Sequence, residues 1–140
     1  MAVIPVTNAL VLVNSVDLSN HVQSITTEDS RDEVDVTAMG STSKQVAKGL
    51  GDASITIEFF QDYAGGSVHA TLSPLIGSST SFPVEVRAVN AARSATNPAT
   101  LLAAAFLTTY PAVVATVGDA SVISAKFINA GQAGMTYPTA

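Results

Sequence analysis

The segment Ser54–Phe60, with the sequence SITIEFF, decides the fold class of this chain. Its residues alternate strictly between apolar and polar side chains up to the last position. The apolar side chains are those of Ile55, Ile57 and Phe59, and the polar ones are those of Ser54, Thr56 and Glu58. A period of two places successive side chains on opposite faces of a β-strand. The segment therefore predicts a strand with one face on a core and one polar face.

The same pattern recurs along the chain and predicts six more strands. We expect them at Asn8–Val13, Val22–Glu28, Glu33–Met39, Phe82–Val89, Leu101–Tyr110 and Ser121–Asn129. The segment Leu101–Tyr110 is apolar on both faces, which is typical of a strand that is buried on both sides. Polar stretches that favour turns separate these segments. The whole pattern predicts a mainly β fold, an antiparallel β sandwich or open barrel.

One segment has the period of a helix instead. Its apolar residues recur at a spacing of four, seven and eight, which places them on one stripe of a helix. These residues are Val68, Leu72, Leu75 and Ile76. Pro74 lacks an N–H group and crowds the carbonyl of Ala70, so it tightens or kinks the last turn. We expect a short helix of two or three turns, between Ser67 and Gly77, packed over a sheet.

The composition indicates a surface that is short of charge. The chain has 140 residues, the size of one domain, and a formal net charge of −5. Charged residues make up 12% of it, about half of the ~25% usual for soluble domains. The longest apolar run, Leu101–Leu107, is too short to span a membrane, and MAVIPVTN at the start does not resemble a signal peptide. We therefore expect other copies of the protein to cover much of the surface.

The residues that usually carry chemistry are missing or scattered. There is no Cys, the only histidines are His21 and His69, and neither lies in a zinc-binding pattern. No G-x-S-x-G elbow or P-loop is present. Lys and Arg number six in all and do not cluster, which argues against phosphate contacts with nucleic acid. The sequence predicts no catalytic, cofactor-binding or metal-binding residue, and no enzyme.

The acidic stretch Glu28–Asp35 is open to three interpretations. It is a solvated strand face, an interface that pairs with Lys44 and Lys48 of a neighbouring copy, or a calcium loop. The calcium interpretation is the weakest because the spacing and glycine of a calcium loop are missing. The polar segment Gly40–Lys48 that follows is expected to be an exposed loop or hairpin tip.

The order of these segments resembles the major tail tube proteins of long-tailed, non-contractile (siphovirus-type) bacteriophages. The resemblance covers about Leu10–Gly131, nearly the whole chain. Its most telling stretches are Asp35–Gly40 (DVTAMG), followed by a polar loop, then a strand ending in Phe59–Tyr63 (FFQDY) and the helix segment Ser67–Gly77. No single motif is chemically specific, so the order of the segments carries the likeness.

The resemblance implies a two-sheet β sandwich with a flanking helix, and a structural function without enzymatic activity. Such subunits form homo-oligomeric rings, usually of six, which stack into a hollow tail tube of the virion. Genome DNA passes through the tube during ejection without specific binding. The implied partners are further copies of the chain, the tape-measure protein and the tail-tip or terminator proteins. Assembly takes place in the host cytoplasm, and no membrane is involved.

The resemblance also assigns roles to parts of the chain. Residues 1–140 form a single tail tube domain, with an N-terminal arm at 1–8, an exposed loop at 40–50 and a C-terminal tail at 131–140. The candidate lumen-facing residues are Ser54, Thr56, Glu58, Glu85 and Arg87. The candidate inter-ring loop carries Asp32, Glu33, Asp35, Lys44 and Lys48. A neutral or negative lumen suits DNA that must slide, because basic side chains would hold its phosphates.

Three alternatives to the tail tube protein remain. The first is that the chain is another virion structural subunit, such as a tail terminator or a capsid decoration protein, or a tube protein of a type VI secretion-like system. A carbohydrate-binding β sandwich is a weaker alternative because the chain has no Trp for an aromatic platform. An enzyme is the weakest, since no acid, base, nucleophile and metal ligand occur together.

Overall fold

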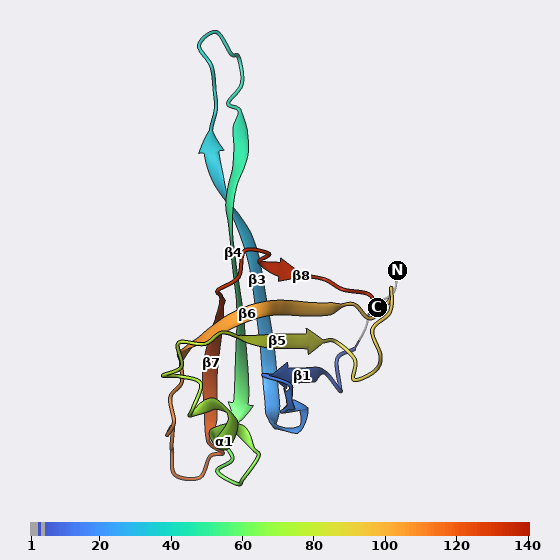
Figure 1. The fold of residues 1–140 in the computed structure, drawn as a ribbon, viewed down its shortest axis with the longest axis vertical. Coiled ribbons are helices and arrows are strands. Elements are labelled where there is room, and N and C mark those ends of the chain that lie inside the picture. Colours follow the sequence, from blue (N-terminus) through green and yellow to red (C-terminus); the bar gives the residue numbers. More distant parts are fainter. Residues whose placement is uncertain (1–2, 4) are drawn as a thin grey trace.

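A computed structural model describes residue 3 and residues 5–140 of the chain (Figure 1). Antiparallel strands dominate this part of the chain. The strands are β1 (Leu10–Val13), β2 (Val16–Asp17), β3 (Val22–Asp35), β4 (Val46–Phe60), β5 (Phe82–Arg87), β6 (Ala99–Thr109), β7 (Val122–Asn129) and β8 (Met135–Thr136). A 3-10 turn, η1 (Ser19–His21), and one short α-helix, α1 (Val68–Leu72), complete the described elements. The prediction of a mainly β fold with one short helix is confirmed.

The strands form two layers of one folded sheet. The strand order is β2-β1-β5-β6-β7-β4-β3, with β8 added to β6. Strands β3, β4 and β7 follow the long axis of the molecule, and β1, β5 and β6 lie across them (Figure 1). Strand β6 joins the layers because its first part pairs with β5 and its last part, from Ala105 to Thr109, pairs with β7.

The core fills the space between the layers. The apolar face of Ser54–Phe60 is fully buried there, as its alternation predicts. Phe127 of β7 lies opposite Ile55 of β4 and Leu107 of β6, and its ring meets the edge of Phe82 with centroids 6.0 Å apart. Val68 and Leu72 of α1 add to the same core. The apolar positions of both layers therefore hold the fold together through burial.

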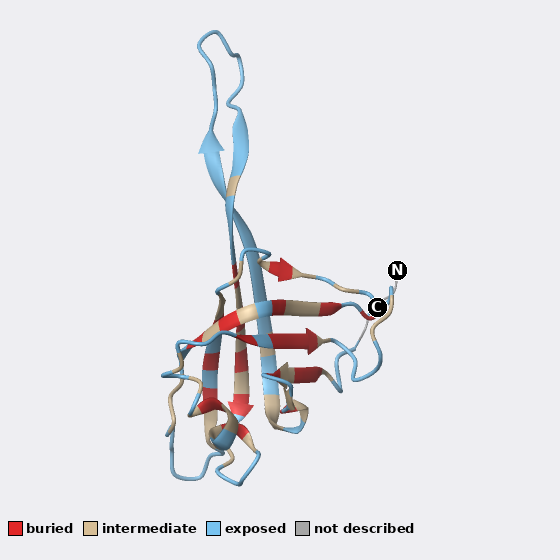
Figure 2. Cartoon of the chain, in the orientation of Figure 1, coloured by how far each residue is buried: buried red, intermediate tan, exposed pale blue. Residues whose placement is uncertain are grey.

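The hairpin β3–β4 extends far beyond the core. Its strands are 14 and 15 residues long, and their register is irregular between Arg31 and Glu33. We call residues 32–50 beyond this point the finger; it projects from the body and is almost entirely exposed (Figures 1 and 2). The segments Val22–Glu28 and Glu33–Met39 are predicted as two strands, but Val22–Glu28 and residues 33–35 lie in the single strand β3. The prediction is wrong for residues 36–39, which follow the end of β3 and are not in a strand. The predicted loop at 40–50 is wrong at its end, because β4 begins at Val46 and pairs with Asp35.

The helix is shorter than predicted. It ends at Leu72, with Ser73 as its last capping residue, and Pro74 follows directly. Proline cannot donate the next helical hydrogen bond, which explains the stop. After the helix the chain continues in turns. There the backbone N–H groups of Leu75 and Ile76 donate hydrogen bonds to the carbonyl of Leu72, at 3.0 and 3.3 Å. No helix in the described part of the chain has the length and apolarity to cross a membrane.

Two further expectations need correction. Strand β6 is buried on one face only: Leu102 and Ala105 face the core, while Ala103 is exposed. The C-terminal segment 131–140 is not a free tail, because β8 pairs with β6 and Pro138 accepts a backbone hydrogen bond from Ala99. Of the expected N-terminal arm, residues 1, 2 and 4 lie outside the described residues, and Val6, Thr7 and Asn8 are exposed.

Candidate assembly surfaces

The outer face of β3, β4 and β7 is largely polar. Its central row is the predicted one, Ser54, Thr56 and Glu58 of β4. The register places Glu28, Thr26 and Ser24 of β3 directly opposite these residues on one side, and Ile128, Lys126 and Ser124 of β7 opposite them on the other. We call the polar members the polar face: Ser24, Thr26, Glu28, Ser54, Thr56, Glu58, Ser124 and Lys126. Small hydroxyl side chains make up most of this surface.

The charges of the polar face are few and weakly held. Glu58 accepts a hydrogen bond of 2.9 Å from the hydroxyl of Ser24. Glu28 and Lys126 are exposed to water, so the face carries two carboxylates and one ammonium group. A surface of hydroxyl groups with little net charge offers a polyanion no strong contact.

Glu85 and Arg87 do not belong to the polar face, although the prediction from the sequence groups them with Ser54, Thr56 and Glu58. This prediction needs correction for Glu85. Both lie on β5, in the other layer, and Glu85 is only 5% exposed. Arg87 pairs with the Glu85 carboxylate at 2.6 Å between Nη2 and Oε2, and Arg93 pairs with its other oxygen. Loop 88–98 carries Arg93 across the outer face of β5, so the Glu85 carboxylate is covered.

Removing the charge of Glu85 should cost stability. Glu85→Gln leaves two arginine side chains that are 17% and 27% exposed without their carboxylate. Loss of one partner from a largely buried ion pair is costly, and partial exposure reduces the cost here to about 2–3 kcal/mol. Urea unfolding should show this loss in the free energy of unfolding. The matched change Glu58→Gln, on the polar face, should shift it by less than about 0.5 kcal/mol; equal losses in both variants would contradict the assignment.

The five predicted residues of the inter-ring loop all lie on the finger and are exposed. The strand places Glu33 and Asp35 on one face of the hairpin and Asp32 on the other, so these carboxylates do not converge as a calcium site requires. Glu33 lies opposite Lys48 in the register. The backbone N–H of Thr37 donates to Asp35 Oδ1 at 2.9 Å and lowers the pKa of that carboxyl.

Hydrogen bonds close the finger near its tip. The hydroxyl of Thr37 accepts from the backbone N–H of Gln45 at 2.8 Å, and Val36 donates to the carbonyl of Gln45 at 3.0 Å. Gly40 turns the chain with a φ of +89°, a conformation that favours glycine. The finger is therefore an ordered hairpin, although it has no core of its own.

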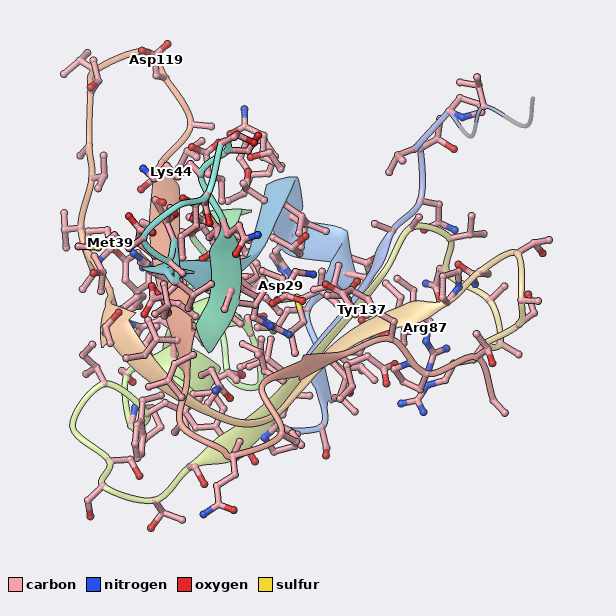
Figure 3. The ribbon with its side chains drawn as sticks, turned by 90° about the horizontal axis from the view of Figure 1, so that it is seen from above. Asp29, Met39, Lys44, Arg87, Asp119 and Tyr137 are labelled. Atoms are coloured by element: carbon pink, nitrogen blue, oxygen red, sulfur yellow. The ribbon has the colours of Figure 1, made fainter. Side chains whose placement is uncertain are left out.

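A cluster that the sequence does not reveal holds the root of the finger. Tyr137 donates to Asp29 Oδ2 at 2.7 Å, and Arg31 donates to Asp29 Oδ1 at 2.6 Å (Figure 3). The hydrogen bond from Tyr137 and, next, the one from Arg31 lower the pKa of Asp29. The bond between Tyr137 and Asp29 raises the pKa of Tyr137. The segment after β8 thus packs against β3 where the finger leaves the body.

A second unpredicted network lies at the opposite end of the molecule. His69 Nδ1 is 2.6 Å from the hydroxyl of Tyr110, and Gln61 donates to that hydroxyl at 3.0 Å and to the carbonyl of Ala112 at 2.7 Å. Tyr63 donates to the same carbonyl at 2.7 Å. These bonds fix residues 110–112, the start of the loop between β6 and β7.

His21 and Asp62 form another contact at this end. Their Nε2 and Oδ2 atoms are 2.9 Å apart. The pKa of Asp62 is lowered, chiefly by the backbone N–H of Ala64, which donates to Oδ1 at 2.9 Å. Each described histidine thus contacts a side chain that helps to order a loop. Within residues 3 and 5–140, no three acidic or histidine side chains gather as metal ligands.

Solved structures share this fold although the sequence matches no protein-family model and no curated protein sequence. A chain of the native gene transfer agent virion superposes with a TM-score of 0.73 at 11% identity, covering 94% of this chain and 95% of that one. A chain of the sheath/tube terminator of the extracellular contractile injection system PVC gives 0.71 at 15% identity, covering 99% and 98%. A chain of the tail of an empty gene transfer agent particle, with C6 symmetry, gives 0.64 at 11% identity, covering 84% and 82%. The likeness establishes the fold, and the three structures named here are components of virions and phage-tail-like particles.

Proposed function

We propose that this chain is a structural, non-enzymatic subunit of a phage-tail-like tube, in which all 140 residues act as one domain. The observation that carries the proposal is the shared fold: chains from a virion and from a tube terminator match it over at least 94% of both partners. Matches of this extent span the whole fold, which favours a single function for the whole chain. The sequence resemblance to tail tube proteins of non-contractile phages supports the same function, and with it a subunit of a virion that is assembled in the host cytoplasm.

The subunits form rings, and the rings stack. Six copies per ring agree with the C6 symmetry of the gene transfer agent tail. If each copy supplies β3, β4, β7 and the end of β6, roughly 24 strands spaced ~4.8 Å apart and tilted ~40° close into a barrel about 48 Å across its backbone. Strand β3 lies at the edge of the sheet, so its outer backbone groups are free to meet the next copy.

The polar face lines the tube in this arrangement. Its serine and threonine hydroxyls keep the lumen wet, and its single lysine is outnumbered by Glu28 and Glu58. Genome DNA can then slide without the phosphate contacts that basic side chains would make. A tape-measure protein would occupy the same lumen before ejection, and terminator and tail-tip proteins would meet the ends of the tube.

The finger contributes to contacts between rings. Nothing in the described part of its own subunit packs over it, and it carries both acidic residues and Lys44 and Lys48. Of the three interpretations of the acidic stretch, an interface between copies accounts best for a long ordered hairpin that leaves the body. Strand-long exposed hairpins are otherwise a liability for a free protein.

Electron microscopy of the concentrated, purified protein tests the proposal. We expect hollow tubes or rings of uniform diameter in negative stain, either spontaneously or after an initiator complex is added. A protein that stays monomeric under both conditions would remove the basis of the proposal.

Chemical labelling tests the position of the polar face. The chain has no Cys, so Thr56→Cys introduces a single thiol. We expect a maleimide coupled to a protein of about 50 Å to label this thiol in free subunits and at least tenfold less in assembled tubes, because the reagent is as wide as the barrel. The control Ala103→Cys, at an exposed position of β6 in the other layer, should label in both states. Equal labelling of Thr56→Cys in subunits and tubes would place the polar face outside.

A tube terminator is the second candidate function. It is favoured by the match to the PVC sheath/tube terminator, with a TM-score of 0.71 over 99% of this chain. A terminator would form single rings that bind the end of an existing tube. Purified protein that yields rings but no tubes, with or without an initiator complex, would select this candidate.

A further inference from the structure

We propose that the tip of the finger of one copy packs on the loop between β6 and β7 of a second copy in the next ring. We call this loop, residues 110–121, the distal loop. The inference rests on the proposed tube and names the surface that receives the finger. It follows from two sets of unpartnered side chains that one subunit cannot bring together.

The first set lies on the finger. Large apolar side chains on it have no core to enter, and they are Val34, Val36, Met39, Val46 and Leu50. Met39, at the tip, is 105% exposed, which means that nothing in the described chain covers it. Val34 and Val36 alternate with acidic or polar residues, so they form an apolar stripe on one face of the hairpin. Such a stripe marks a surface that another protein covers.

The second set lies on the distal loop. Val113, Val114 and Val117 are all exposed, and Val117 is 104% exposed. The loop is nevertheless anchored, because Gln61 and Tyr63 bind the carbonyl of Ala112, and the hydroxyl of Ser121 donates to the carbonyl of Val114 at 2.5 Å. Because the loop is held in place, its exposed valines form a preformed apolar surface that can receive the finger of another copy.

The two sets lie at opposite ends of the molecule. The finger rises from one end of the long axis, and the distal loop closes the other end (Figure 1). Seen along that axis, Met39 and Lys44 of the finger and Asp119 of the distal loop lie on the same side of the body (Figure 3). A second copy displaced along the axis therefore brings its distal loop over the first copy's finger. This contact is head-to-tail, so it repeats from ring to ring without closing on itself.

Opposite charges flank the two apolar sets. Lys44 stands at the tip of the finger, and Asp119 stands in the distal loop. Neither forms an ion pair within the described chain. In the head-to-tail arrangement these two side chains lie across the same contact, which favours this register over one that brings Lys44 to a neutral surface.

The contact between two subunits is small, and it holds rings together only because every copy in a ring makes it. A few valine and methionine side chains bury far less than the roughly 1,200–2,000 Å² of a stable two-protein interface. A single pair of subunits therefore does not hold together by it. A ring presents one finger and one distal loop per copy, so the contacts add when two rings meet.

Disulfide cross-linking tests the contact in assembled tubes. We expect the variant Met39→Cys with Val117→Cys to give, on mild oxidation of tubes, a ladder of covalent dimers, trimers and longer chains in non-reducing gels. A head-to-tail contact predicts this ladder because each copy offers one thiol to the copy above and one to the copy below. The control pair Met39→Cys with Ala103→Cys should give no ladder. Tubes of the first variant that oxidise without a ladder would overturn the inference and leave the proposed tube intact.

Exchange of charges is a second test that needs no new thiol. Lys44→Asp should raise the protein concentration needed for tube assembly, by roughly two- to fivefold for an exposed ion pair. Adding Asp119→Lys to it should restore assembly to near the parent level. If the second change instead worsens assembly, the two residues do not meet and the inference fails. Absence of tubes from the parent protein itself would contradict the proposed function instead.

Discussion

A chain with a shortened finger should fold as stably as the parent and form no tubes. The change replaces residues 36–45 with Asn-Gly. Asp35 lies directly opposite Val46 in the register, so a two-residue turn can join them without disturbing the strands below. The removed residues are all exposed and contribute nothing to the core. We therefore expect the free energy of unfolding to stay within about 0.5 kcal/mol of the parent.

Assembly should respond quite differently. The shortened chain lacks the tip residues that we assign to the contact between rings, so stacking loses one contact per subunit. We expect no tubes by electron microscopy at ten times the concentration at which the parent assembles. A matched control changes Ser41, Thr42 and Ser43 to Ala, which keeps the length of the finger and its apolar stripe. Long tubes from the shortened chain would show that the finger is not needed for stacking.

Phe127→Ala should destabilise the subunit more than the loss of the Glu85 charge does. Phe127 has no exposed surface, and it lies between Ile55 of β4 and Leu107 of β6, at the junction of the two layers. Truncation of a buried phenylalanine leaves a cavity and costs about 3–5 kcal/mol. Domains of this size have a total stability of about 5–15 kcal/mol, so the variant should be at the limit of folding at physiological temperature.

Urea unfolding measures this loss against a matched control. Phe60→Ala removes the same side chain from the last residue of β4, where it is 39% exposed. We expect that change to cost about 1–2 kcal/mol. A loss for Phe127→Ala that is no larger than the loss for Phe60→Ala would mean that the junction is not the centre of the core.

The strands and their faces could be predicted because they depend on local alternation. Ile55, Ile57 and Phe59 face the core as expected, and Ser54, Thr56 and Glu58 share the opposite face. The position of Glu85 could not be predicted in the same way. Its place on β5 follows from alternation, but its burial follows from Arg93 in a loop that crosses the strand. No local pattern in a single sequence reveals such a crossing.

The finger shows a second limit of periodicity. Val34 and Val36 alternate with polar residues as well as any core strand, yet they are exposed because β3 has left the body at that point. Alternation identifies the side of a strand that another surface covers, and it does not identify which molecule supplies that surface. The contact between Tyr137 and Asp29 could not be predicted from the sequence either, since the residues are far apart in the chain and neither lies in a distinctive motif.

Strand β6 has a mechanical consequence. Since backbone hydrogen bonds run through it from one layer to the other, the layers cannot slide over each other without breaking part of the ladder. Each subunit should therefore respond to load as a stiff block. A filament built from such blocks would flex at the joints between neighbours, and its bending rigidity would be set by the side chains at those joints.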